Sequence, residues 1–143
     1  MRTCEGLGVQ KLYLTGYTPY PPTTNDSRLP HIGQKLGSQI HKTALGAENT
    51  LDWAYENDIH ATLEKLKRNG YMLVGLEQTS DSIALNKLEI PPKLALLLGN
   101  EVTGIDGDLI EKMDFTVEIP MKGKKESFNV IEAAAMAMYH FML

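Results

Sequence analysis

The sequence has a single cysteine, no long apolar run and no cluster of metal-ligating side chains. Cys4 is the only cysteine among 143 residues, so no disulfide can form within the chain, and no cysteines and histidines have the spacing of a metal site. The longest apolar runs fall short of the roughly 20 residues of a membrane-spanning helix, and residues 1–10 lack the apolar core of a signal peptide. These features indicate a soluble protein of a reducing compartment, with the cytoplasm as the expected location.

Strong charge of one sign is also missing. The formal net charge is -4 at pH 7, with 14 Lys and Arg against 18 Asp and Glu. Without a global basic field, a nucleic acid would have to bind a local patch or one that a partner subunit contributes. Lys122, Lys124 and Lys125 form a small cluster of this kind, although a short charged loop is more often simply solvated.

Several common enzyme motifs do not occur in the sequence. There is no G-x-G-x-x-G after a strand, no G-x-x-x-x-G-K-[ST] and no G-x-S-x-G, which argues against dinucleotide-binding, P-loop and hydrolase functions. His31, His41, His60 and His140 are far apart in the sequence. Unclustered histidines more often pack or lie on the surface than catalyse or bind metal, so none is a candidate site residue.

The apolar pattern predicts an α/β fold with a mostly parallel sheet flanked by helices. The length and the 43% hydrophobic content suit one domain, residues 1–143. Apolar runs predict strands at 71–77, 93–99 and 115–120, and the lack of polar alternation indicates strands covered on both faces. Before these strands we expect a strand at 8–16, an irregular proline-rich loop at 17–30 and a further loop at 31–56. The glycines of the 31–56 loop break any helix, apart from a short helical turn before Trp53. Helices are expected at 58–69 and 106–113, capped by Asp58 and Asp106, and at 129–143.

Three polar loops, at 75–80, 98–104 and 119–129, follow the apolar strands. In a parallel sheet the carboxyl ends of the strands form the edge at which ligands bind, so we expect these loops to meet there. Gly99, Asn100, Glu101 and Gly104 allow two interpretations. The glycines could let the backbone pass close to a flat ligand. Alternatively, Gly99 and Gly104 supply positive φ and Asn100 a side-chain turn in an ordinary connection, which the spacing alone slightly favours.

Two segments, LALLLGNEVTGI and VEIPMKGKKESFNVIEAAAMAMY, closely resemble the second and third motifs of the SpoU (TrmH-like) branch of the SPOUT RNA methyltransferases. TALGAE and W-x-Y, within residues 43–55, resemble the family's segment before the helix. Phe128 stands where the family has leucine, and Ile131 and Glu132 follow where serine is usual, whereas Ser127, Asn129 and Val130 are retained. These departures bear on substrate choice more than on cofactor binding.

The resemblance implies a C-terminal trefoil knot that binds S-adenosylmethionine, with RNA (tRNA or rRNA) as substrate, a ribose 2′-hydroxyl as nucleophile and no metal. The backbone of Gly99, Ile119 and Met121 would bind adenine and ribose, and Phe128 would wall the pocket. The implied cofactor contacts are Glu77, Gln78, Thr79, Gly99, Asn100, Glu101, Ile119, Met121, Ser127, Phe128 and Asn129.

The implied catalytic residues are Arg2, Glu101, Ser127 and Asn129. MRTCEGLGV matches only the second half of the family's first motif, so Arg2 aligns with the motif arginine, and the preceding strand and motif asparagine have no counterpart. This suggests an N-terminally truncated reading frame. The family's usual dimeric state also implies a homodimer, and Met136, Met138 and Met142 of the last helix suit either that interface or the core. Two functions follow: an active RNA ribose 2′-O-methyltransferase, or an impaired SPOUT-like module that binds cofactor or RNA without catalysis.

Overall fold

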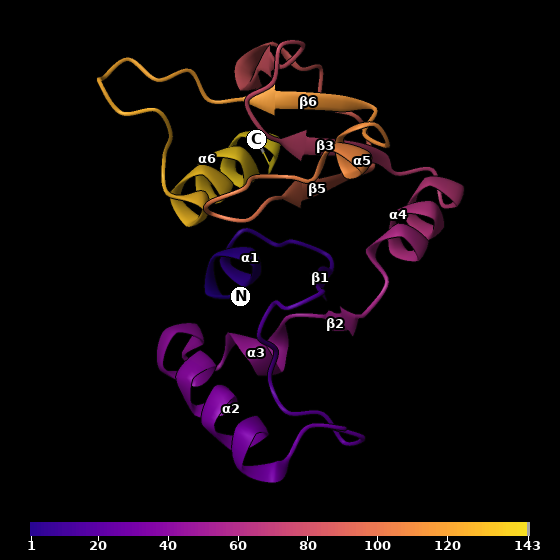
Figure 1. Ribbon diagram of the computed structural model, residues 1–143, viewed down its shortest axis with the longest axis vertical. Helices are drawn as coiled ribbons and strands as arrows, with labels where there is room; N and C mark the ends of the chain where they lie inside the picture. The colour runs from indigo at the N-terminus through magenta and orange to yellow at the C-terminus, as the bar shows by residue number, and fades with distance from the viewer. Residues whose placement is uncertain (143) are drawn as a thin grey trace. The chain divides into compact units, whose positions relative to one another are not determined.

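The computed structural model of the protein describes residues 1–142 and divides into two compact units, Met1–Ile59 and the residues from His60 on (Figure 1). The first unit contains α1 (Arg2–Gly6), β1 (Leu12–Thr15), α2 (Pro30–Ala44), α3 (Ala47–Thr50) and β2 (Trp53–Glu56). From the unit boundary onward the chain forms α4 (Ile59–Arg68), β3 (Met72–Leu76), β4 (Ile83–Ala84), the 3-10 helix η1 (Leu85–Lys87), β5 (Leu94–Leu98), α5 (Gly107–Ile110), β6 (Phe115–Glu118) and α6 (Val130–Met142). All pairs of these strands are parallel, which confirms the predicted α/β class.

The first unit is built on a two-stranded parallel sheet. β1 and β2 pair from Leu12 opposite Trp53 to Thr15 opposite Glu56. The strand predicted at 8–16 is thus confirmed as β1, and the helical turn predicted before Trp53 is confirmed as α3. β2 was not predicted, because it lies in the mixed 31–56 segment, which shows no clear strand pattern.

The prediction of a loop at 31–56 is wrong for much of this segment, because α2 is a helix of 15 residues that begins at Pro30. Gly33 and Gly37 lie one turn apart, on the same face of this helix. A Cβ at Gly37 would lie 2.7 Å from Pro22 Cδ, and one at Gly33 would lie 3.2 Å from Asp26 Oδ2. The glycines therefore let the proline-rich segment pack closely against α2, and this packing offsets a helix-propensity cost of about 1 kcal/mol per glycine.

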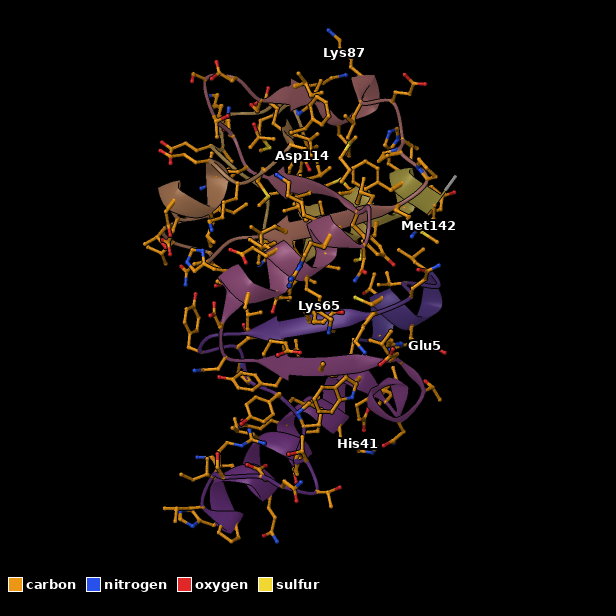
Figure 2. All side chains as sticks on the ribbon, turned by 90° about the vertical axis from the view of Figure 1, so that its right-hand side faces the viewer. Glu5, His41, Lys65, Lys87, Asp114 and Met142 are labelled. Carbon is orange, nitrogen blue, oxygen red and sulfur yellow. The ribbon has the colours of Figure 1, made fainter. Side chains whose placement is uncertain are left out.

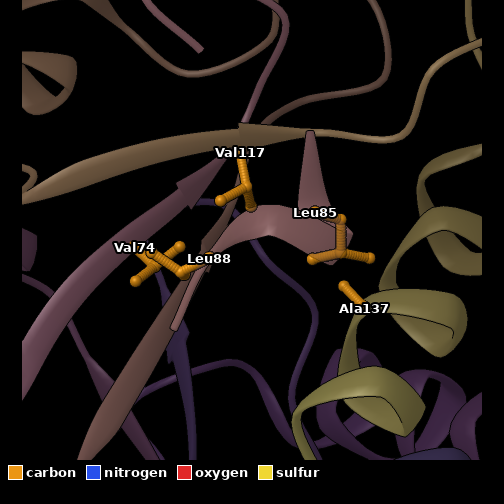
Figure 3. Close-up of a cluster of buried hydrophobic side chains, with 5 residues drawn as sticks. All are labelled: Val74, Leu85, Leu88, Val117 and Ala137. Carbon is orange, nitrogen blue, oxygen red and sulfur yellow. The ribbon is translucent and has the colours of Figure 1, made fainter. Parts of the chain in front are cut away.

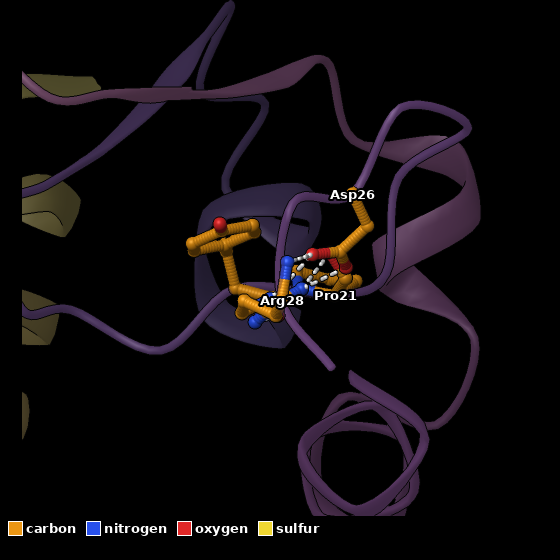
Figure 4. Close-up of polar contacts among 4 residues, drawn as sticks. Pro21, Asp26 and Arg28 are labelled. Atoms are coloured by element: carbon orange, nitrogen blue, oxygen red, sulfur yellow. Dashed lines mark hydrogen bonds and ion pairs between the residues drawn. The ribbon is translucent and has the colours of Figure 1, made fainter. Parts of the chain in front are cut away.

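Arg28 holds the irregular segment before α2 in place (Figure 4). Its guanidinium donates two hydrogen bonds to the Asp26 carboxylate, one of them from Nε at 2.8 Å. It also donates to the carbonyl oxygens of Tyr20, at 3.0 Å, and Pro21, at 3.3 Å. The same group lies 3.6 Å from the centre of the Tyr20 ring, which stacks on Tyr55. The segment has no helix or strand, as predicted, but is extensively bonded.

The sheet of the second unit has the order β4-β6-β3-β5. The strands predicted at 71–77, 93–99 and 115–120 are confirmed as β3, β5 and β6, whereas the two-residue β4 is too short to be predicted. Asp114, labelled in Figure 2, fixes the register of β3 against β6. Its backbone N–H donates to the Leu73 carbonyl and its Oδ2 accepts from the Leu73 N–H, both at 2.8 Å. Lys67 Nζ lies 3.1 Å from the other carboxylate oxygen.

Five buried side chains form the core cluster of this unit: Val74, Leu85, Leu88, Val117 and Ala137 (Figure 3). They come from β3, η1, the turn after it, β6 and α6, so the last helix packs on the same core as the central strands. The expectation that β5 is covered on both faces is wrong. In this sheet β5 is an edge strand, its first four residues are half-buried, and Leu98 is 39% exposed.

The remaining helices agree with the sequence pattern. α4 confirms the helix predicted at 58–69, and its Leu63 is buried between half-buried Ile59 and Leu66. α5 and α6 confirm the two later helices, and the predicted end of the last one at residue 143 lies outside the described residues. The expected side-chain cap at Asp106 is wrong, because its backbone carbonyl, and not its carboxylate, accepts hydrogen bonds, from the N–H groups of Leu109 and Ile110. Within residues 1–142 no helix has both the length and the hydropathy needed to cross a membrane.

We predict that the Arg28–Asp26 pair makes the stability of the first unit depend on pH. The hydrogen bonds from Arg28 hold the pKa of Asp26 well below its usual range. A lowered folded-state pKa gives stability that is fully present above the unfolded value of about 4 and is lost as the pH falls further. The free energy of unfolding of the Asp26→Asn variant, followed by denaturant titration, should therefore lie below that of the parent protein at pH 7. The difference should shrink below pH ~4. A difference of the same size at pH 3 and pH 7 would contradict the prediction.

Candidate functional site

The candidate site lies where three parallel strands end. β3 pairs with β5 on one side and with β6 on the other, so the carboxyl ends of all three strands form one edge of the sheet. The segments that leave this edge are residues 77–82, 99–106 and 119–129. The expectation that the three polar loops share an edge is confirmed.

The loop after β5 turns back on itself at once. Asn100 and Gly104 form an antiparallel bridge, in which each N–H donates to the other's carbonyl at 2.9 Å. A Cβ at Gly99 would overlap the backbone of Gly104, and Gly104 has a φ of +70°. The two glycines thus have different causes. Gly104 supplies a positive φ, as one interpretation requires, whereas Gly99 does not and is needed because the returning backbone leaves no room for a side chain.

Asn100 forms the side-chain turn expected in one of the two interpretations of this segment. Its Oδ1 accepts hydrogen bonds from the N–H groups of Val102, at 2.7 Å, and Thr103, at 3.2 Å. Glu101 lies at the tip of this turn and is exposed, as is Val102, whose exposure reaches 91%. The turn therefore presents the Glu101 carboxylate to solvent on a rigidly bonded backbone.

The loop after β3 is tied both to its own turn and to the neighbouring loop. Glu77 Oε2 accepts a hydrogen bond of 2.9 Å from the Ile105 N–H. Thr79 Oγ1 lies 3.1 Å from Thr116 Oγ1. Ser82 Oγ is within hydrogen-bonding distance of the Thr79 carbonyl and of Glu118 Oε2, at 2.9 Å in each case, and accepts from the Thr79 N–H. Ser82 is not among the predicted site residues, since a hydroxyl in a polar loop gives no signal from which this role could be found.

The third loop joins β6 to α6 and swings away from the sheet before it returns (Figure 1). Ile119 and Met121 at its start are half-buried, whereas residues 122–129 are exposed, Ser127 and Phe128 among them. Asn129 caps α6: its Oδ1 accepts from the Ile131 N–H and its carbonyl from the Ala133 N–H, both at 2.9 Å. The structure thus gives Asn129 a local structural role.

Arg2 belongs to the first unit, whereas the other predicted site residues belong to the second. It is exposed at the start of α1 and lines a hollow of about 400 Å³. The other lining residues are Glu5, Ala44, Leu45, Gly46, Ala47 and Thr50.

The corner between α2 and α3 forms one wall of this hollow. Leu45 has a φ of +52°, a conformation rarely adopted by residues other than glycine. Glu48 holds the corner, because its carboxylate accepts from the Gly46 N–H at 3.0 Å and contacts His41 Nδ1 at 2.5 Å. The hydrogen bond with His41 lowers the pKa of Glu48. No sequence pattern marks Leu45, because its conformation follows from these surrounding contacts.

Comparisons with known proteins agree with this architecture. A family model described as the SpoU rRNA Methylase family matches residues 1–139. A tRNA (guanosine(18)-2'-O)-methyltransferase of Borreliella burgdorferi is 32% identical over 133 residues, which cover 83% of this chain and 61% of that protein. A mouse protein of the same description is 40% identical over 79 residues, which cover 55% of this chain and 5% of that protein. The chain thus spans less than two thirds of the length of these relatives.

Solved structures show the same fold. A TrmH/SpoU tRNA modifying enzyme of A. aeolicus has a TM-score of 0.76 at 21% identity, and the match covers 99% of this chain and 64% of that one. An AdoMet-bound rRNA methyltransferase of Sinorhizobium meliloti has a TM-score of 0.77 at 18% identity, with 98% and 48% covered. With the family model matching nearly the whole sequence, the resemblance drawn from the two motifs is confirmed, and this chain belongs to the SpoU rRNA methylase family.

Proposed function

We propose that the chain is an S-adenosylmethionine-dependent RNA ribose 2′-O-methyltransferase acting on tRNA or rRNA. The observation that carries the proposal is the edge of three bonded loops, in a chain whose residues 1–139 match the SpoU family model. Relatives named as tRNA (guanosine(18)-2'-O)-methyltransferase and as 23S rRNA (guanosine-2'-O-)-methyltransferase support this activity and both classes of RNA.

The cofactor is proposed to bind at the carboxyl edge, to residues 77–79, 99–101, 119–121 and 127–129. The tight turn at Gly99 fits this role, because Gly99 has no side chain and the backbone of Gly104 closes directly against it beside the end of β5. The backbones of Gly99, Ile119 and Met121 would bind adenine and ribose, and the exposed Phe128 would cover them. S-adenosylmethionine supplies an electrophilic methyl group when bound. The proposal includes the trefoil knot of the family, with the 119–129 loop and α6 as its threaded part.

The chain's own residues would position the nucleophile and assist the loss of one proton. A ribose 2′-hydroxyl needs in-line placement beside the methyl group, and positioning supplies much of the catalysis in such a transfer. Arginine stays protonated in proteins, so we assign Arg2 the activation of the hydroxyl through hydrogen bonding and charge, together with an RNA phosphate. Glu101, Ser127 and Asn129 would hold Arg2 and the target nucleotide. The two units would then act together as one methyltransferase domain.

RNA and a second subunit complete the proposal. Lys122, Lys124 and Lys125 are all exposed in the loop before α6, where they could neutralise phosphates close to the site. The apolar side chains that α6 exposes suit a homodimer interface: Ile131 is 70% exposed, Tyr139 58% and Met142 53%. A dimer would double the lysine cluster and could bring Arg2 of one subunit to the loops of its partner. The proposed setting is the cytoplasm.

The first prediction from this proposal concerns cofactor binding. Gly99→Ala should weaken the affinity for S-adenosylmethionine at least about tenfold, because its Cβ would overlap Gly104 and force the turn open. Isothermal titration calorimetry of the folded protein measures the effect. Gly107→Ala is the matched control, because a Cβ there meets no atom within 4 Å, and it should leave the affinity unchanged. Absence of heat with the parent protein and either the cofactor or its demethylated product would refute the site.

The second prediction concerns Arg2. Arg2→Ala should lower the rate of ribose methylation at least about 100-fold and leave the cofactor affinity nearly unchanged, because Arg2 acts on the hydroxyl and phosphate. Arg2→Lys should also remain mostly inactive, since lysine lacks the planar fork of donors.

The control is Arg68→Ala, which removes an exposed arginine from α4. Methylation is measured by nucleoside mass spectrometry of treated tRNA and rRNA. An unchanged rate in Arg2→Ala would show that the assignment is wrong, and a parent chain that binds cofactor but never methylates would favour the non-catalytic module.

The third prediction concerns assembly. Ile131→Glu should convert a dimer to a monomer, because it places a charge on the exposed apolar face of α6. Light scattering at micromolar concentration reports the mass. Ile90→Glu, at another exposed apolar residue, should leave the dimer intact. A parent protein that is monomeric under these conditions would exclude both the interface and a site shared between subunits.

A further inference from the structure

We propose that Glu77 is a positioning residue of the methyltransferase site and not a contact of the cofactor. Its carboxylate fixes the 99–105 turn against the end of β3 and thereby sets the shape of the site before any ligand binds. This inference rests on the proposed function for the identity of the ligand, and it replaces the role of direct cofactor contact that the family resemblance implies for Glu77.

Glu77 connects all three strand ends that form the edge of the site. It is the first residue after β3, and its backbone N–H donates to the Val117 carbonyl of β6 at 3.0 Å. Its side chain crosses to the loop after β5, where Oε2 accepts from the Ile105 N–H at 2.9 Å. The other oxygen, Oε1, accepts from the Gln78 N–H at 3.2 Å. One residue therefore links β3, β6 and the 99–105 turn.

Both carboxylate oxygens are engaged within the protein, which argues against a primary role in ligand contact. Backbone N–H donors to a charged acceptor form stronger hydrogen bonds than neutral pairs do. Ile105 is buried, with an exposure of 8%. Removal of the Glu77 carboxylate would leave the Ile105 N–H without this acceptor, and a buried donor without a partner is costly. The 99–105 turn would thus lose an anchor close to its buried end.

Gly104 supports the same conclusion independently of the hydrogen bonds. A Cβ at position 104 would overlap Glu77 Oε2, and the residue also has a φ of +70°. The second glycine of the G-N-E-x-x-G segment is therefore required twice, by its conformation and by the glutamate that lies against it. The glycine and Glu77 are 27 residues apart in sequence but form one closely packed unit.

Two variants separate the contributions of the carboxylate. Glu77→Ala removes both acceptors. Glu77→Gln retains one oxygen for the Ile105 N–H but turns an amide N–H₂ group toward the Gln78 N–H, so it should cause a smaller loss. Glu89→Ala is the control, because it removes the same charge from an exposed residue that precedes the amino end of β5.

The experiment compares hydrogen exchange of the ligand-free proteins with their affinity for S-adenosylmethionine. In Glu77→Ala we expect the amides of Ile105 and Gly104 to exchange at least about tenfold faster, the affinity to fall at least about tenfold, and the Leu73 amide in β3 to keep its protection. Glu77→Gln should lie between Glu77→Ala and the parent protein in both measurements. Glu89→Ala should match the parent.

The outcomes distinguish this inference from the proposed function. If affinity falls in Glu77→Ala while exchange in the 99–105 turn is unchanged, Glu77 is a direct ligand contact and the inference is overturned. If exchange accelerates but affinity stays at the parental value, the turn does not shape the site and the inference is again overturned. If the parent protein does not bind S-adenosylmethionine, the proposed function fails, while accelerated exchange in Glu77→Ala still establishes the anchoring of the turn by Glu77.

Discussion

The return of the backbone at Gly104 onto Gly99 is the constraint on which the candidate site depends. Two hydrogen bonds of 2.9 Å between Asn100 and Gly104 close the turn, and the space beside Gly99 is filled by backbone. A turn closed so tightly has few alternative conformations, so little entropy remains to be lost when a ligand binds to it. Glu77 Oε2 accepts a hydrogen bond from the Ile105 N–H at the end of this turn.

The parallel sheet supplies the frame for this turn. Its strand order places β3 between β5 and β6, so that the loops after these three strands start from neighbouring positions. A shift of one residue in strand register would move every side chain to the opposite face. Asp114 opposes such a shift, because its backbone and its carboxylate both bind Leu73. The core formed by Val74 and Val117 adds an apolar reason for the same register.

Glycine has a different structural role at each of the positions that the sequence patterns emphasised. At Gly104 the expected positive φ is correct. At Gly33 and Gly37 the expected break in the helix is wrong, because close packing of the Pro22 and Asp26 segment on α2 outweighs the low helix propensity. Local propensity is a weak guide wherever a contact with a distant segment uses the missing side chain. A sequence pattern does not reveal that contact.

The sequence by itself determined the positions of the apolar strands along the chain, the class of the fold and the family, because a continuous apolar run and a G-N-E-x-x-G segment are local features. It also identified the polar residues of the three loops. Only the tertiary structure decided that β5 is an edge strand and that Glu77 binds the turn at Ile105. These roles depend on backbone groups that folding brings within hydrogen-bonding distance, and a donor 28 residues from its acceptor leaves no periodic trace in the sequence.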